Sequence, residues 1–201
     1  MQKVTTAILS IVIATLIVLA GKAIFSKTNH MSATTPDGAV KSFLEMMIPH
    51  HEEAVGTAKV IMMDSSITVP EVRLLAARIA DAQEFEIVQM EGWYQEWFGT
   101  EYVFDPSMYN PMMSDTTKVI SDARAKVWLK DMIKHHEHAI DMANETQKLI
   151  TDLQKKDTTT DGTLSITTTH PGIDTTLLFA EKVKTEQTRE IAEMKELLKK
   201  L

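Results

Sequence analysis

Apolar residues recur every three or four positions along four long stretches of the chain. The first stretch carries them at Val40, Leu44 and Met47, and the same stripe continues through His51 and Ala54. This 3-4 alternation predicts amphipathic helices, and no alternation typical of strands competes with it. Four such stretches predict an all-α protein folded as a four-helix bundle.

Several segments between these stretches have the residues that usually begin a helix. Thr35-Pro36-Asp37 and Ser121-Asp122 are typical of helix starts. Thr68-Val69-Pro70-Glu71 combines a capping-box pattern with an early proline, so we expect Thr68 to cap the second helix.

Two motifs occur twice, which indicates a duplicated helical hairpin. Met47-Ile48-Pro49-His50-His51 returns as Met132-Ile133-Lys134-His135-His136, at an offset of 85 residues. The segments 83–90 and 187–194 share Gln, Glu, Ile and Met at the same spacing. The predicted domain covers residues 32–201, with repeat 1 at about 37–97, repeat 2 at about 121–201 and a Thr-rich inserted loop at 157–172.

The N-terminal segment has the composition of a membrane-targeting sequence. Residues 4–21 carry no charge and at about 1.5 Å per residue would span roughly 27 Å, near the thickness of a bilayer core. Residues 1–31 are therefore either a transmembrane anchor with its linker or a signal peptide, and we favour the anchor because only Lys3 marks a charged n-region. The working domain is expected outside the cytoplasm, periplasmic or at the cell surface, and otherwise secreted after cleavage.

Charge and cysteine content limit the possible partners and metal ligands of the chain. The chain after residue 31 holds 18 basic and 28 acidic residues, which argues against nucleic acid as a partner. The chain has no Cys, so a metal site must use His, Met or carboxylate ligands.

The duplicated motifs place imidazole and thioether groups on adjacent helical turns. Met47 precedes His50 by three residues and His51 by four, a spacing that lets one ion touch both kinds of side chain. The predicted ligands are Met47, His50, His51, Met90, Met132, His135, His136 and Met194. Further ligands, or groups that support the ligands, are expected among Glu86, Glu190, His138, Met112 and Met113.

A soft thioether combined with a borderline imidazole indicates the metal. This mixture suits a copper ion, with Cu(I) favoured and Ag(I) as its analogue, whereas Ca²⁺ and Mg²⁺ want shells rich in oxygen. The competing interpretation is that the histidines are buried polar pairs and the methionines fill the core. The matched positions of the two His pairs favour the metal site.

At these motifs the chain resembles the domain-of-unknown-function family 305, whose hallmark is a doubled Met-Ile-x-His-His. The likeness covers residues 38–201 and includes Met112-Met113-Ser114 ahead of the second copy. The resemblance implies a ferritin-like bundle, export from the cytoplasm and, for some members, binding of copper or silver.

Three functions from different classes are compatible with the sequence. The first is a non-catalytic, extracytoplasmic protein that buffers or sequesters copper or silver, with a homo-oligomer or a metal-transfer protein as a further partner. The second is a ferritin-like di-iron oxidase, although the Glu-x-x-His motif expected twice in such enzymes is missing. The third is a metal-free, membrane-tethered helical interaction module.

Overall fold

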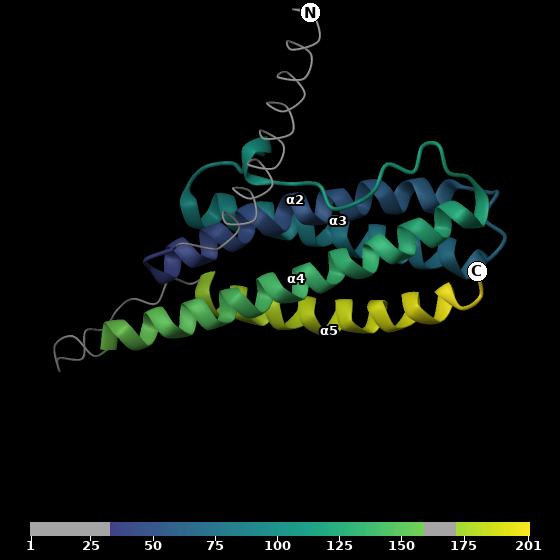
Figure 1. The fold of residues 1–201 in the computed structure, drawn as a ribbon. Coiled ribbons are helices and arrows are strands. Elements are labelled where there is room, and N and C mark those ends of the chain that lie inside the picture. The colour runs from purple at the N-terminus through teal and green to yellow at the C-terminus, as the bar shows by residue number, and fades with distance from the viewer. Residues whose placement is uncertain (1–32, 159–171) are drawn as a thin grey trace, which may run out of the picture. The chain divides into compact units, whose positions relative to one another are not determined.

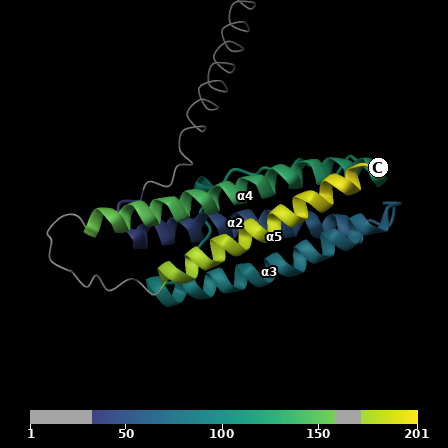
Figure 2. The same ribbon diagram turned by 90° about the horizontal axis from the view of Figure 1, so that it is seen from below.

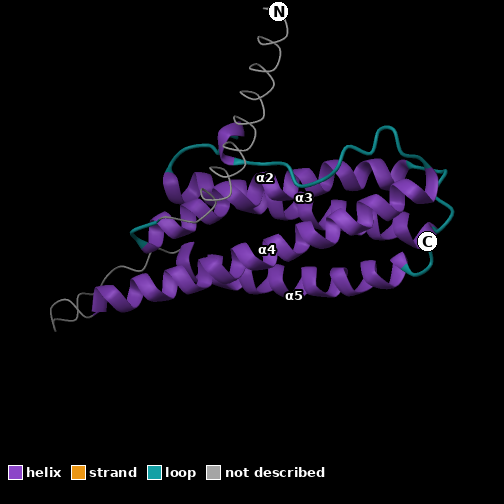
Figure 3. Ribbon diagram, in the orientation of Figure 1, coloured by secondary structure: helices purple, strands orange, loops and turns teal. Residues whose placement is uncertain are grey.

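The computed structural model describes residues 33–158 and 172–201. The predicted anchor or signal segment and most of the Thr-rich insertion lie outside the described residues. Within them the only regular elements are helices, so the prediction of an all-α four-helix bundle is confirmed (Figure 3). None of the described helices combines the length and apolarity needed to cross a membrane.

Four long helices form two antiparallel hairpins. The first hairpin pairs α2 (Pro36–Met63) with α3 (Pro70–Phe98), and the second pairs α4 (Ser121–Thr158) with α5 (Gly172–Leu198). A single 3-10 turn, η1 (Pro106–Met108), interrupts the crossover between them. The crossover runs back along the bundle, so α4 is antiparallel to α2 (Figure 1).

The hairpins meet mainly through one pair of helices. α2 packs extensively against α3 and also against α4, whereas α5 touches α2 and α3 far less. Figure 2 shows the four helices from below. The α2/α4 contact is therefore the seam of the bundle, and both His doublets lie on these two helices. Duplication thus brings the same motif to both sides of one interface.

The helix starts follow local chemistry, with one difference from the prediction. Thr35 caps α2, because its Oγ1 accepts a hydrogen bond from Gly38 N at 3.1 Å. The prediction of a capping box at Thr68 was wrong, since the N-cap of α3 is Val69, without a side-chain bond. Thr68 instead donates from its backbone N and its hydroxyl to Asp122, at 2.7 and 2.5 Å.

Candidate metal centre

Four imidazoles form the centre of the seam. His50 and His51 on α2 and His135 and His136 on α4 each have no exposed surface. Neighbouring residues on a helix point about 100° apart, so the two histidines of each doublet face different elements. The first histidine of each pair faces the opposite hairpin, and the second faces its own hairpin partner.

His50 and His135 meet across the seam. Their ring centroids are 3.6 Å apart and their planes are inclined by 34°. Burial, followed by the neighbouring imidazoles, holds the pKa of His50 well below its usual value. Burial also lowers the pKa of His135 to about 4, although Glu53 opposes this shift. Both rings are therefore neutral at neutral pH and keep a lone pair that can bind a metal.

His51 and His136 are each held by a buried carboxylate from the other helix of their own hairpin. His51 Nε2 lies 3.0 Å from Glu86 Oε2, and His136 Nε2 lies 2.8 Å from Glu190 Oε2. If Nε2 carries the proton donated to the carboxylate, the lone pair is on Nδ1, as in many metal sites.

Lys182 distinguishes the two His-Glu pairs. Its ammonium lies 3.0 Å from Glu86 Oε1, whereas His51 contacts the other oxygen, Oε2. Burial raises the pKa of Glu86, but His51 and Lys182 outweigh burial and the pKa is lowered. His51, and after it Lys182, thus favours the ionised form of Glu86.

Several buried nitrogens of this cluster lack hydrogen-bond partners. Both ring nitrogens of His50 are unpaired, as is Nδ1 of His51, of His135 and of His136. The other nitrogen of His135, Nε2, lies 3.3 Å from a Glu53 oxygen. An unpaired buried polar atom is costly and rare, and a bound cation would satisfy such nitrogens. The residues present therefore fit a metal ion.

All four predicted methionine ligands are fully buried. Met132 and Met194 belong to the apolar cluster that also contains Leu129 and Ile191. Met47 on α2 and Met90 on α3 are likewise without exposed surface. The thioethers therefore lie in the same interior as the imidazoles.

Glu53 is a functional candidate that the sequence reasoning missed. One of its oxygens, Oε2, lies 3.3 Å from His135 Nε2. The same carboxylate accepts hydrogen bonds from the Tyr109 hydroxyl and from the backbone N of Met112 and Met113. Burial raises the pKa of Glu53, but these contacts outweigh it and lower the pKa to about 2. The sequence feature that could have identified Glu53 is its position in the repeat, because His138 occupies the matching position of repeat 2.

The remaining predicted groups lie around the buried imidazoles. His138 is half-buried, and its ring centroid is 5.3 Å from that of His50. Met112 is exposed and Met113 half-buried, and both are tied to Glu53 through their backbones. In residues 33–158 and 172–201, no three His, Asp or Glu side chains already surround one point as metal ligands. An ion held here thus needs a thioether or a rotated ring to complete its shell.

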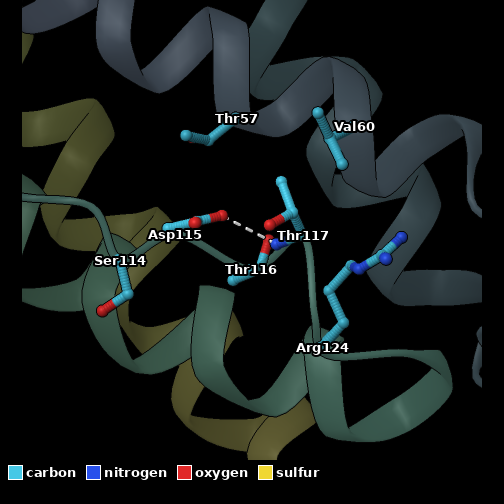
Figure 4. A pocket seen from close by; sticks show the side chains of 7 residues that line it. All are labelled: Thr57, Val60, Ser114, Asp115, Thr116, Thr117 and Arg124. Atoms are coloured by element: carbon cyan, nitrogen blue, oxygen red, sulfur yellow. Dashed lines mark hydrogen bonds between the residues drawn. The ribbon is translucent and has the colours of Figure 1, made fainter.

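A pocket of about 420 Å³ lies elsewhere on the seam (Figure 4). Its lining consists of Thr57, Val60, Ser114, Asp115, Thr116, Thr117 and Arg124. The Arg124 guanidinium is already bonded to Val119 O and to Asp64. The pocket contains none of the predicted ligands, so it is separate from the imidazole cluster.

The chain matches one family and one group of solved structures. The domain of unknown function DUF305 matches residues 41–161, more than half of the chain. No curated protein sequence matches. The chain is 26% identical to CopM in its Cu(I)-bound form, with a TM-score of 0.60 over 80% of this chain and 96% of that one.

Two further structures show the same fold. The Ag-bound form of CopM, obtained by co-crystallisation, is 26% identical, with a TM-score of 0.57 over 80% of this chain and 96% of that one. A DUF305 fragment from Deinococcus radiodurans is 21% identical, with a TM-score of 0.58 over 81% of this chain and 97% of that one. With its doubled His-His motif, and with a family match over more than half of its length, the chain belongs to the DUF305 family.

Proposed function

We propose that the protein binds copper, with Cu(I) preferred and Ag(I) as its analogue, and that it buffers or sequesters the metal without catalysing a reaction. The observation that carries this proposal is the group of four fully buried imidazoles whose unpaired nitrogens come from both hairpins. CopM, to which the chain is similar, is known in Cu(I)-, Cu(II)- and Ag-bound forms.

The donor set fits this metal class. The ligands we assign are His50, His51, His135 and His136, with the thioethers of Met47, Met90, Met132 and Met194. Bound there, Cu(I) or Ag(I) gains soft sulfur and borderline nitrogen donors. Glu86 and Glu190 contact Nε2 of two imidazoles, which would leave Nδ1 of each ring to hold the metal.

The proposed setting is outside the cytoplasm, on a ferritin-like bundle built from two repeated hairpins and tethered by residues 4–21. A metal-transfer protein, or a second copy of this chain, would then receive or supply the ion. These assignments rest on the N-terminal sequence and on the family.

The di-iron oxidase is the competing function, and the buried carboxylates Glu86 and Glu190 are what favour it. Both carboxylates are occupied, however, because each contacts a histidine and Glu86 also pairs with Lys182. We expect no bound iron after aerobic reconstitution of the full-length chain in mild detergent. A diferric absorption band would favour the oxidase.

Competitive titration with a Cu(I) chelator tests the proposed function. Replacing His50, His51, His135 and His136 together by Gln should weaken Cu(I) binding more than about a hundredfold, because even groups that only support a ligand are worth 10- to 100-fold. The control is Glu137→Gln, an exposed change on α4. Circular dichroism checks that the quadruple variant is folded, and the two double variants, one for each hairpin, cover the case in which it is not. Unchanged Cu(I) affinity in the folded variants contradicts the proposal.

A further inference from the structure

The two halves of the seam differ at one repeat position. Three residues after the first histidine of each doublet, repeat 1 has Glu53 and repeat 2 has His138. Each of these side chains faces the first histidine of the opposite hairpin. Glu53 Oε2 lies 3.3 Å from His135 Nε2, and the His138 ring lies 5.3 Å from the His50 ring. Repeat 2 therefore adds a fifth imidazole to the seam, where repeat 1 adds a carboxylate.

The spacing of the rings decides which imidazoles can share an ion. A metal-nitrogen bond of about 2.0 Å puts the ion roughly 3 Å from the ring centre, so two imidazoles on one ion have centroids roughly 4.5 to 6 Å apart. The 5.3 Å between His50 and His138 falls within this range. The 3.6 Å between His50 and His135 is a stacking distance, so one of these two rings must rotate before both can hold the Cu(I) ion of the proposed function.

Both members of the pair have nitrogens to offer. His50 is fully buried with two unpaired ring nitrogens, and Nδ1 of His138 is also buried and unpaired. His138 is only partly buried, whereas His50 has no exposed surface, so the pair lies closer to solvent than the four buried imidazoles. Water molecules can therefore complete a coordination shell there, which a fully buried site does not allow.

We propose that His50 and His138 form a second, nitrogen-only metal site, which takes a borderline divalent cation and binds Cu(II) most tightly. Imidazole without sulfur suits divalent copper better than Cu(I), and the usual order of divalent affinities peaks at copper. The site shares His50 with the Cu(I) centre of the proposed function but does not need the methionines. It gives the protein separate donors for the two oxidation states of one metal.

Electron paramagnetic resonance of the full-length chain in mild detergent, loaded with one equivalent of Cu(II), tests this site. The wild-type spectrum should show at least two coupled nitrogens. His138→Asn should remove one of them and weaken Cu(II) binding about tenfold or more, while Cu(I) affinity stays within about twofold. His138→Glu, which installs the residue of the matching repeat position, should remove the same nitrogen, and Glu137→Gln should leave the spectrum unchanged.

Each outcome decides between the alternatives. An unchanged nitrogen coupling and an unchanged Cu(II) affinity in the folded His138 variants overturn the second site, and His138→Glu serves if His138→Asn does not fold. Loss of Cu(I) binding together with Cu(II) binding in both variants also overturns it, since His138 would then belong to the Cu(I) centre. A wild-type chain that binds Cu(II) through His138 but shows no Cu(I) affinity would contradict the proposed function and leave this site standing.

Discussion

Full burial and the loss of charge together determine what the histidines of the doublets can do. Water cannot reach His50 or His135, and the lowered pKa of each ring keeps it neutral near neutral pH. A neutral imidazole binds metals and a protonated one does not. The same residues are poor core formers, because Nδ1 of both rings and Nε2 of His50 are buried without a hydrogen-bond partner among the described residues.

The methionines offer a test that separates binding from packing. Met→Leu at Met47 and Met132 conserves volume and removes the sulfur, so the change in unfolding free energy should stay below about 1.5 kcal/mol. Cu(I) affinity should nevertheless fall, because the soft donor is gone. Met63→Leu, at a position 77% exposed, is the control. Chelator competition and thermal denaturation measure the two effects, and a Cu(I) affinity equal to that of the wild type would make these methionines core residues only.

Much of the cluster was predictable at the residue scale because its members are repeated. The duplicated motif pointed to the four histidines, and the match of segment 83–90 with 187–194 pointed to Glu86 and Glu190. The roles of Glu53 and Lys182 were not predictable, because each contacts a side chain on a helix of the other hairpin. Contacts of this kind depend on how the hairpins dock, which no local pattern encodes.

At the scale of elements, hydrogen bonds to two carboxylates hold the crossover after α3 against the α2/α4 seam. Glu53 on α2 accepts from the backbone N of Met112 and Met113, and Asp131 on α4 accepts from Ser114 N at 3.3 Å. The Glu53 carboxylate also contacts His135, so one side chain touches both the crossover backbone and a seam imidazole. The hydrogen bonds of Glu53 therefore link the crossover to the imidazole cluster.

Weakening the hydrogen bonds between Glu53 and the crossover should accelerate hydrogen exchange of the crossover amides. Glu53→Gln keeps one acceptor oxygen and loses the charge, and hydrogen bonds to charged groups are worth about 1.5 to 3 kcal/mol. Exchange at the Met112 and Met113 amides should therefore accelerate roughly tenfold to a hundredfold. The neighbouring exposed Glu52→Gln is the matched control and should leave both rates unchanged. Equal protection in Glu53→Gln and wild type would show that other contacts hold the crossover.

The turn between α2 and α3 holds the start of α4 through a second set of side chains. Asp64 accepts from Ser66 and from Arg124, and Ser121, at a left-handed φ of 57°, bonds to Ser66. The sequence suggested only that Thr68 caps its own helix. Its actual partner, Asp122, is 54 residues away, and a local pattern cannot reveal such a partner.

Acid should weaken this turn. Hydrogen bonds from Ser66, followed by the Arg124 charge, lower the pKa of Asp64 below its usual 3.8. A lowered folded-state pKa adds stability above the usual value, and that stability is lost as pH falls through the lowered pKa. Asp64→Asn should thus melt at a lower temperature than wild type at neutral pH, and the difference should shrink in acid. Asp141→Asn, an exposed change on α4, should show no such pH-dependent difference, and a constant Asp64→Asn difference at all pH values would contradict the assignment.

At the scale of the whole molecule, an ion at the seam would join the two hairpins. Apolar contacts already hold them, since one buried cluster contains residues of all four helices. The four-helix architecture was predictable because each amphipathic stripe is long and regular. The docking of α2 against α4 was not predicted, because the amphipathic pattern does not say which helices of the two hairpins meet.

Metal-linked stabilisation separates a metal-binding protein from a metal-free interaction module. Ag(I) at about 100 times its Kd should stabilise the fold by about 2.7 kcal/mol. For a domain of this size that raises Tm by roughly 5 to 10 °C. Thermal denaturation of the full-length chain, with and without Ag(I), measures the shift, and the quadruple His→Gln variant is the control. A wild-type Tm that Ag(I) does not raise would favour the module.

The most direct test of the central claim is the Cu K-edge X-ray absorption spectrum of the full-length chain loaded with Cu(I). We expect a Cu(I) edge and a first shell that contains both nitrogen and sulfur, from imidazoles of α2 and α4 and from buried methionines. The quadruple His→Gln variant should lose the nitrogen contribution. A first shell of oxygen alone, or a wild-type spectrum that the quadruple variant reproduces, would contradict the account.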